Sequence, residues 1–580
     1  SGHGCISEET MVQRALGIRS ERSDDIPLII QWLTQMRIVE LIDENLPAPH
    51  GNRQGLSYGQ LSVLLLSYIV SQADHRLCAV DPWAKQRQKT LERSTGWSLS
   101  ETEVTDDRLG ALVEVLGKQQ DSLEQIELEL GQHLIRAYAL PTEVGRCDTS
   151  SFSVYHQLDE AEASAGILRR GHSKDHKGHQ RQYRQMLGTL DPAGMPLVSS
   201  TLPGNGADDP IYVGVWEQLA AVIGHKAFVY IADCKAASHQ NRARIAQAGG
   251  IYCFPLPETG QVPQLLQSWV LNPPDGLEPI RLPPHSPEDP PIGVGFEMEL
   301  GKLWQDPDGS SAFHWSERYL LIHSYALAER QMQTLNKRLE QADAALTKLS
   351  AKLIEDRCKL QNEAQSILKR YRVQKFFSFE FDSLRMTDNK HSEHPKASKR
   401  AKKATEPAVK KHFFLNFRRQ EQTIQTAIQL AGWRIYVTNA QAERLPLAQA
   451  IAYYRDQWQT ENGFHRFKRG KLPALPIYFQ NQDRIVGLMF LLTIALRVFT
   501  LMEFVVRRNL QTLNSKLSGL YEGNPRRATE RPSAEQMLRA FRNITLYHLP
   551  NSTSESTPLN PLQQRILALM NIPEAIYDFP

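Results

Sequence analysis

The spacing of apolar and polar positions changes along the chain, and each change predicts a different kind of element. Residues 25 to 140 carry apolar positions at helical spacing, with Ser57 as the N-cap of an apolar run, so this region is predicted to be helical. From about residue 141, short segments rich in β-branched and aromatic residues are separated by Gly and Pro, which predicts three antiparallel strands. A helix, a buried strand ending at Asp233, a second helix and another strand follow.

The predicted order of these elements, β-β-β-α-β-α-β, is that of an RNase H-like core. In such a sheet the first and fourth strands are neighbours. Asp148 lies in the first strand and Asp233 ends the fourth, so the two carboxylates are expected to lie close together. The competing interpretation is that an aspartate at a strand end is a turn or cap residue.

The region after this core begins with an irregular segment and continues as a long helical one. Residues 255 to 295 are rich in proline and are predicted to be irregular, whereas residues 324 to 374 are predicted to be helical. Apolar residues recur there every seven positions, which indicates a coiled-coil-like seam formed either by a hairpin within the chain or by a dimer. The seam consists of Met332, Leu339, Leu346, Leu353, Leu360 and Ile367.

The remaining part returns briefly to strand-like patterns before it becomes helical again. Segments 413–420 and 432–439 are predicted strands, and residues 471 to 580 are predicted to be helical. The most apolar run of this last region is interrupted by Arg497 and Glu503. It therefore predicts a buried core helix rather than a membrane span.

The stretch YYRDQWQTENGFHRFKRG, residues 453 to 470, is predicted to be one basic helix. Tyr454, Glu461 and Lys468 are spaced seven apart, which places them on nearly the same face of such a helix. A face with one carboxylate among several cations suggests an acidic polymer or a metal-bound phosphate as its partner. Trp458 is expected to pack into the core, with base stacking as the alternative, and Tyr454 either packs inward or orients a phosphate through its hydroxyl.

Composition excludes some classes of function but does not identify the function. A chain of 580 residues with 41% apolar and 23% charged residues predicts a soluble protein of three or four domains. Its net charge of +3 is too small to indicate nucleic-acid binding by itself. Six scattered cysteines without a CxxC pair suit a reducing cytoplasm, and the absence of a GxxxxGK[ST] loop gives no sign of a nucleotide cofactor. Residues 1 to 10 are interpreted as a possible tag remnant.

Local clusters of cations make a stronger case for nucleic acid. Between Lys390 and Arg419 the chain has ten Lys and Arg against two Asp and Glu, and the segment 390–412 is predicted to be a linker or loop. It would bind DNA through phosphate contacts, the alternative being a solubilising loop. The cations singled out there are Lys399, Arg400, Lys402 and Lys403. Near the predicted helix, Lys468 is expected to hold a DNA phosphate, while Arg466 and Arg469 either do the same or form a solvated face.

Several motifs together resemble one protein family. Tyr454, Glu461 and Lys468 match the signature Y-x2-R-x3-E-x6-K, with Gln457 at the arginine position and Arg455 two residues earlier. The chain resembles DDE transposases of bacterial insertion sequences that carry this Tyr-Arg-Glu-Lys signature, in the sixteen-thirty-four branch of the fourth insertion-sequence superfamily. The likeness extends over nearly the whole chain, through segments such as LIDENLP, GLSYGQL, DHRLCAVDPWAKQR, CDTSSFSVYH, GHSKDH, DPAGMPLVSSTLPGN, YIADCKAAS and GNPRRATERPSAEQML.

The resemblance implies both a fold and a site. Asp148, Asp233 and Glu461, separated by 85 and 228 residues, would be the catalytic and metal-binding triad, holding two Mg²⁺ ions with Mn²⁺ as a possible substitute. Tyr454, Arg455, Gln457 and Lys468 would contact DNA. The implied fold is an α+β multidomain protein with an RNase H-like mixed β-sheet core, a helical N-terminal domain, an insertion domain containing long helices, and a helical C-terminal region.

The corresponding domain boundaries follow the changes of pattern. After the possible tag remnant they are 11–140 (N-terminal domain, end binding), 141–260 (first part of the core), 261–440 (insertion), 441–515 (second part of the core) and 516–580 (C-terminal region).

The implied activity is cleavage of the element's terminal inverted repeats and their joining to target DNA. The implied partners are double-stranded DNA, both transposon ends and target, and a second copy of the chain in the DNA complex, with no membrane. The implied location is the bacterial cytoplasm. Two alternatives stay open: a metal-dependent nuclease without strand transfer, and a domesticated DNA-binding protein that has lost catalysis.

Overall fold

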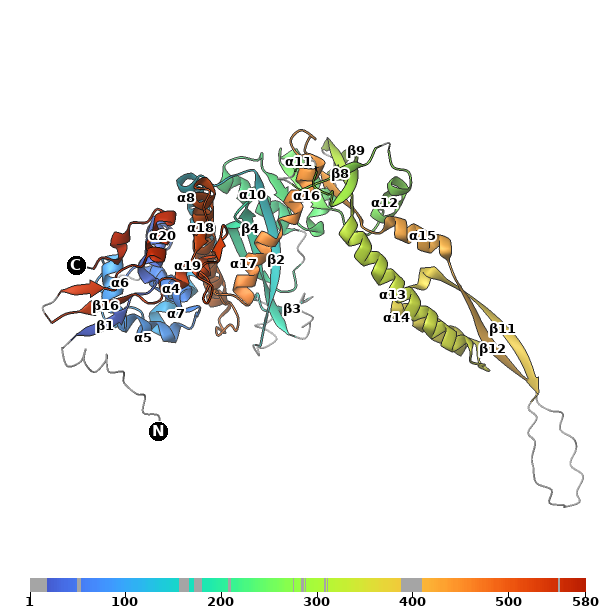
Figure 1. Ribbon diagram of the computed structural model, residues 1–580, viewed down its shortest axis with the longest axis horizontal. Helices are drawn as coiled ribbons and strands as arrows, with labels where there is room; N and C mark the ends of the chain where they lie inside the picture. Colours follow the sequence, from blue (N-terminus) through green and yellow to red (C-terminus); the bar gives the residue numbers. More distant parts are fainter. Residues whose placement is uncertain are drawn as a thin grey trace, which may run out of the picture.

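The protein is an elongated mixed α/β molecule with several distinct parts (Figure 1). The computed structural model describes residues 18–49, 54–155, 166–171, 180–206, 210–274, 276–282, 286, 288–306, 309, 311–387, 409–550 and 553–579. The possible tag remnant lies outside these residues, as do the four cations singled out in the basic segment. Figure 1 shows a lobe built from both ends of the chain, a central sheet, and an arm that projects from the far side of the sheet.

The N-terminal region is helical, as predicted, and it packs with the C-terminal region in one lobe. Ser57 caps its most apolar helix, because its side chain accepts a hydrogen bond from the backbone of Gln60 in a reciprocal capping box. The N-terminal helices are α2 (Ile26–Gln35), α3 (Ile38–Asn45), α4 (Tyr58–Gln72), α5 (Val80–Lys85), α6 (Gln88–Thr95), α7 (Asp106–Lys118) and α8 (Gln120–Tyr138).

The end of the chain is less helical than predicted. The first strand, β1 (Arg19–Arg22), pairs with β16 (Thr545–His548), which in turn pairs with β17 (Ser554–Ser556), so a small sheet joins the two ends of the chain. The other C-terminal elements are the strand pair β14 (Leu517–Ser518) and β15 (Ala528–Thr529), followed by the helices α19 (Ala534–Arg539) and α20 (Pro561–Met570).

Helix α18 (Gln482–Thr512) is the central core helix of the lobe. It is long and apolar enough to cross a membrane, but 94% of its most apolar window is buried inside the protein, which confirms the prediction of a core helix. Arg497, which interrupts the apolar run, is fully buried and pairs with Glu127 of α8 at 2.6 Å. The same guanidinium donates to the carbonyl of Pro196 at 2.8 Å, so the buried charge is hydrogen-bonded on two sides.

A ten-stranded mixed sheet forms the centre of the molecule, in the order β3-β4-β2-β6-β7-β13-β10-β9-β8, with β5 also paired to β4. The predicted β-β-β-α-β-α-β order is confirmed for residues 144 to 255. It is formed by β2 (Val144–Val154), β4 (Arg181–Leu190), β5 (Met195–Pro203), α10 (Ile211–Ile223), β6 (Val229–Ile231), α11 (His239–Gln247) and β7 (Ile251–Pro255), with β3 (Arg169–Arg170) added at the edge of β4. The pairs β2/β6 and β6/β7 are parallel.

Several elements between residues 255 and 324 were not predicted. The proline-rich segment contains helix α12 (Val262–Leu271), with Pro263 in its first turn, where a missing N–H costs nothing. The strands β8 (Glu278–Ile280), β9 (Gly293–Gln305) and β10 (Ala312–Ser324) then extend the same sheet, and the predicted strand at 432–439 is confirmed as β13 (Trp433–Thr438), which pairs with β10 and β7.

The projecting arm has its own core. It consists of α13 (Tyr325–Ser350), α14 (Arg357–Tyr371), the ribbon β11 (Phe377–Thr387) and β12 (Val409–Arg419), and α15 (Glu421–Leu430). Leu339, Leu346 and Leu360 of the predicted seam are buried between the two antiparallel helices, and Leu353 is 45% exposed in the turn that joins them. The heptad pattern therefore forms a hairpin within the chain. Of the basic segment 390–412, residues 409–412 belong to β12, and the rest lies outside the described residues.

Candidate functional site

Asp148 lies in β2, and Asp233 follows two residues after the last residue of the neighbouring strand β6. The parallel register pairs Val144 with Val229 and Arg146 with Ile231, and each aspartate follows two residues after the last pair. Parallel strands are about 4.8 Å apart. The register, continued two residues beyond the last pair, would set the backbone of Asp233 beside that of Asp148, with Asp233 itself just outside β6. The predicted juxtaposition of the two carboxyl-bearing positions is therefore consistent with the register of the sheet.

Both aspartates are half-buried and make local hydrogen bonds. Asp233 caps a 3-10 turn, where its Oδ1 accepts from the backbone N–H of Lys235 at 3.0 Å and from the hydroxyl of Tyr212 at 2.6 Å. The Oδ1 atom of Asp148 accepts from the backbone N–H of Thr149 at 2.7 Å. Asp233 thus does serve as a cap residue, and it makes both of these bonds through one of its two carboxylate oxygens.

The segment 453–470 is not one helix, so that prediction is wrong. It forms α16 (Leu447–Arg455) and α17 (Trp458–Lys468), separated by Asp456 and Gln457. At the break the backbone N–H of Gln457 donates to the carbonyl of Tyr454 at 3.2 Å, a tighter turn than that of an α-helix. The seven-residue spacing from Tyr454 to Glu461 therefore crosses a break and does not define one helical face.

The two helices separate because they pack against different apolar clusters. In α16, Leu447 and Ile451 are buried in a cluster that includes Leu320 and Ile322 of β10. In α17, by contrast, the buried aromatic residues belong to the main core, which includes residues of β2, β4 and α18. A straight helix could not bury its apolar side chains in both clusters at once.

Helix α17 lies across β2 and β4. Near its start, the hydroxyl of Thr460 is 3.0 Å from that of Thr189 on β4, which is paired with Arg146 of β2. At its end, the ammonium of Lys468 lies 5.4 Å from the centre of the Phe152 ring on β2. These two contacts fix the direction of the helix along the strand.

Asp148 lies between the two ends of this contact. Arg146, two residues before it on the same face, donates a hydrogen bond to the carbonyl of Tyr453 at the end of α16. Phe152, four residues after it and again on that face, contacts Lys468. Glu461, in the first turn of α17, is thus carried across the face that bears Asp148.

The break between the helices opens a cavity of about 370 Å³. Four of the predicted site residues line it, and a fifth neighbour, Trp458, is 41% exposed there rather than packed in the core as expected. A continuous helix would have turned Arg455 and Gln457 about 160° apart. The residues that line the cavity are Ile280, Ile292, Gly293, Ile322, His323, Ser324, Leu327, Arg330, Gly432, Arg434, Tyr436, Ile451, Tyr454, Arg455, Gln457, Trp458 and Glu461.

Tyr454 connects this cavity to the two aspartates. Burial raises the pKa of its phenol, Arg434 opposes the rise, and the charges of Asp233 and Asp148 add to it. Both carboxylates therefore lie within electrostatic reach of the hydroxyl. The ring of Tyr454 also packs edge-on against Tyr436, with 4.9 Å between the ring centres. A phenol with a raised pKa stays protonated at neutral pH and can donate a hydrogen bond.

The three residues of the predicted metal triad carry suitable donor atoms, but their side chains are not gathered around one point. Carboxylate oxygens are the donors that Mg²⁺ prefers, and all three predicted residues carry them. Within the part of the chain that the structure describes, however, no group of three or more His, Cys, Asp and Glu side chains is arranged to hold a metal ion. Glu461 is exposed in the cavity wall, so it is not gathered with both aspartates around one point.

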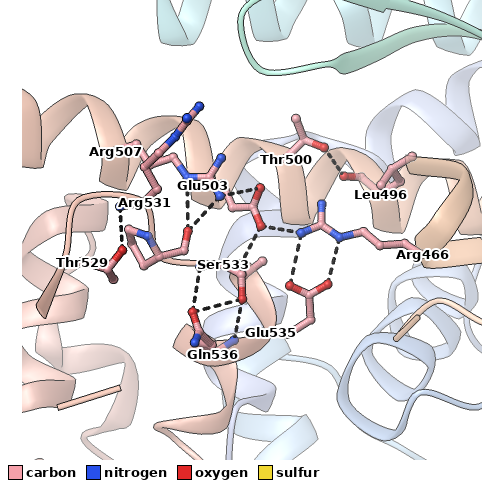
Figure 2. Close-up of polar contacts among 12 residues, drawn as sticks. Arg466, Leu496, Thr500, Glu503, Arg507, Thr529, Arg531, Ser533, Glu535 and Gln536 are labelled. Atoms are coloured by element: carbon pink, nitrogen blue, oxygen red, sulfur yellow. Dashed lines mark hydrogen bonds and ion pairs between the residues drawn. The ribbon is translucent and has the colours of Figure 1, made fainter. Parts of the chain in front are cut away.

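Arg466 is an internal ion-pair residue and not a solvated one. Its guanidinium donates to Glu503 of α18 and, through two nitrogens at 2.8 and 3.1 Å, to Glu535 of α19 (Figure 2). Burial opposes ionisation of Glu535, but the Arg466 charge outweighs it and lowers the pKa of that carboxyl. Arg466 also lies over the ring of Phe499 at 5.3 Å. It is therefore unavailable to a DNA phosphate, whereas Arg469 is exposed and Lys468 half-buried.

The same network anchors the C-terminal segment. Glu503 accepts from the backbone N–H of Ala534 at 2.9 Å and pairs with Arg507 at 3.1 Å, and Arg507 donates to the carbonyl of Pro532 (Figure 2). Arg531, just before that proline, lies over the Trp458 ring at 5.7 Å. The segment GNPRRATERPSAEQML therefore holds α17 in place through the contacts of Glu535 with Arg466 and of Arg531 with Trp458.

Two cations of the cavity, Arg330 and Arg434, were missed by reasoning from the sequence. They come from the arm and from β13, far from the signature in sequence, and only the fold brings them beside Glu461.

No protein-family model matches the chain, and no curated protein matches its sequence.

Proposed function

We propose that this protein is a DNA transposase that binds the terminal inverted repeats of an insertion sequence, cleaves the DNA there and joins the ends to target DNA. The observation that carries this proposal is the register of β2 and β6, in which Asp148 and Asp233 each follow two residues after the last pair, together with the packing of α17, which bears Glu461, over β2 and β4. The element order through residues 144 to 255 supports an RNase H-like core, as does the covering helix.

In this proposal Asp148, Asp233 and Glu461 are the residues that would hold two Mg²⁺ ions, or Mn²⁺ in their place. When bound, such ions supply an activated hydroxyl and neutralise charge at the attacked phosphodiester. The donor set supports this role, and the side chain of Glu461 has to turn from the cavity wall towards the aspartates for the set to close.

The chain's own groups hold the DNA strand. Tyr454 donates a hydrogen bond through a hydroxyl that remains protonated, and Arg455, Gln457 and Lys468 bring charge and amide donors to the same strand. A first cut adds water across a phosphodiester and leaves a 3′-hydroxyl. That hydroxyl then attacks a target phosphodiester, and one P–O bond forms as another breaks, so joining needs no external energy source.

The N-terminal helical domain is proposed to recognise the element's ends. A homodimer would pair two ends, and the lysines and arginines of the 390–412 segment would add sequence-independent contacts to the DNA backbone. No membrane and no nucleotide cofactor enter the proposal.

A strand-transfer assay tests the proposed function. The full chain is incubated with Mg²⁺, labelled DNA that carries the element's ends, and supercoiled target plasmid, with Asp148→Asn as the inactive control. Joined product that disappears in Asp148→Asn supports a transposase. Cut but unjoined ends support a nuclease instead, and retained end binding without cutting supports a DNA-binding protein that has lost catalysis; either result contradicts the proposal.

A further inference from the structure

Three arginines from three separate elements meet in the cavity beside Glu461. Arg330 comes from α13 of the arm, Arg434 from β13 of the sheet, and Arg455 from the end of α16. Glu461 is the one carboxylate among the described residues that line the cavity. Three guanidinium groups against one carboxylate leave the wall with an excess of positive charge.

Among the residues that the structure describes, these three arginines have no carboxylate partner. In those ranges no Asp or Glu oxygen lies within 4.0 Å of their guanidinium nitrogens. The Arg330 side chain donates to the carbonyl of Ala326 in its own helix, at 3.3 Å. The contrast with Arg466 is direct, because that nearby arginine is held by two carboxylates. The cavity arginines are thus available to an anion from outside the chain.

The position of Arg434 follows from the alternation of β13. It pairs with Ile322 of β10 and lies on the same face as Tyr436, whereas Trp433 and Ile435 face the main core. Burial raises the pKa of Tyr436, and the Arg434 charge opposes that rise; it opposes the rise at Tyr454 in the same way, so the guanidinium lies beside both phenols.

The rest of the cavity suits a phosphate group. Its floor is apolar, and a poorly solvated floor strengthens attraction between charges above it. The Gln457 amide and the Tyr454 hydroxyl, which are neutral hydrogen-bond donors, line the same cavity as the arginines. Planar guanidinium groups bind phosphate oxygens through paired hydrogen bonds. The floor consists of Ile280, Ile292, Ile322 and Ile451.

We propose that this cavity binds a phosphate group of a DNA strand, with Arg330 and Arg434 as two residues of that site. The proposal rests on the proposed function for the identity of the anion as DNA. It also explains how the site can bind an anion with the neutral Gln457 at the arginine position of the signature. Arg434 of the sheet and Arg330 of the arm supply the positive charge instead. The proposal also makes the arm one wall of the site, because Arg330 is anchored in its first helix.

Arginine modification tests the pocket without any need for activity. The full chain is treated with phenylglyoxal in the presence and absence of inorganic phosphate at constant ionic strength, and modification is followed at each arginine by peptide mass spectrometry. Arg37, which is exposed and has no carboxylate partner in the described structure, is the control. Phosphate is expected to slow modification of Arg330 and Arg434 and to leave Arg37 unchanged. If phosphate does not change the modification rate of Arg330 and Arg434, as it does not change that of Arg37, the proposal is overturned.

A DNA-binding measurement identifies the anion. Replacing Arg330 and Arg434 together by Gln is expected to weaken binding of a 5′-phosphorylated duplex by roughly tenfold or more, the effect of removing at least one charge-assisted hydrogen bond. Arg539→Gln, which removes an exposed arginine paired to Glu522 in the C-terminal region, is the matched control and should bind normally.

The two proposals can fail separately. Normal DNA affinity in the double variant, with an unchanged melting temperature, overturns the pocket even if Asp148→Asn abolishes cleavage. Phosphate protection at Arg330 and Arg434 together with weakened DNA binding supports the pocket even if no DNA is ever cut.

Discussion

Asp148 in β2 and Asp233 just after β6 each lie two residues beyond the last paired positions of these parallel strands, Arg146 and Ile231. This relationship depends only on backbone register, which the parallel ladder sets over three consecutive pairs. Both carboxylates act on Tyr454, since each adds to the rise in the pKa of its phenol that burial causes. The arrangement is what a pair of cooperating carboxylates needs, and it gives the first prediction.

Replacing Asp148 by Asn should lower DNA cleavage by roughly a thousandfold or more while end binding is retained, because the change removes a charge from the reacting centre and not from the binding surface. Cleavage and gel-shift assays on the same preparation measure both effects. Asp578→Asn, at an exposed aspartate of the C-terminal region, is the control and should behave as the unmodified protein. Cleavage that survives in Asp148→Asn would remove this residue from the mechanism.

Arg466 should matter for folding rather than for DNA. Arg466→Met leaves Glu503 and Glu535 without their shared cation, and breaking a buried ion pair from one side costs about 3–5 kcal/mol. We therefore expect a clearly lower melting temperature in thermal unfolding, with DNA affinity unchanged at temperatures where the protein remains folded.

A second variant separates charge from packing in this network. Arg466→Met combined with Glu535→Gln should recover part of the missing stability, since one unpaired carboxylate is removed and Arg507 still pairs with Glu503. If Arg466→Met instead keeps its melting temperature and binds DNA more weakly, Arg466 contacts DNA and the structural role is wrong.

Asp25 should make stability depend on pH. Burial raises the pKa of its carboxyl to about 6, although a hydrogen bond from Ser71 at 2.6 Å opposes the rise. A raised carboxyl pKa means that the folded state holds the proton more tightly. Its stabilisation is thus complete below about pH 4 and is lost as pH rises through 6, by an amount on the order of 3 kcal/mol.

The variant Asp25→Asn removes this titration. Its melting temperature relative to the unmodified protein should increase steadily between pH 4 and pH 6 and then stay level, as measured by thermal unfolding across that range. A constant difference between the two proteins from pH 4 to pH 7 would show that Asp25 titrates normally.

The basic segment should control the salt dependence of DNA binding. If Lys399, Arg400, Lys402 and Lys403 bind phosphates, their replacement by Gln should reduce the slope of log affinity against log salt by about 0.9 for each phosphate that is no longer neutralised. Fluorescence anisotropy with a duplex of arbitrary sequence at several salt concentrations gives the slope. An unchanged slope would support the alternative of a solubilising loop.

Much of the sheet could be predicted because its pattern is local. The strands from Val144 to Pro255 alternate or run apolar between turn residues, and that order alone predicts that the two aspartates lie close together. The β9–β10 hairpin was missed although Phe296, Met298 and Leu300 alternate clearly with polar residues. The period-2 signal was present, but the prolines before it indicated irregular structure up to residue 295.

The break between α16 and α17 also had a signal in the sequence. Ile451 and Phe464 are both buried, yet thirteen residues of a straight helix would place them about 140° apart. Because one face cannot bury both, the helix has to change direction between them. The contributions of Arg330 and Arg434 had no local signal, since their position depends on how the arm and the sheet meet.

We propose that Asp148, Asp233 and Glu461 act together on a divalent metal. The most direct measurement is a Mn²⁺ titration of the full chain bound to DNA, followed by electron paramagnetic resonance, for the unmodified protein and for Asp148→Asn, Asp233→Asn and Glu461→Gln. The account predicts two bound ions in the unmodified protein and weakened binding in every variant. Unchanged Mn²⁺ binding in Glu461→Gln, with binding abolished in the two aspartate variants, would contradict it.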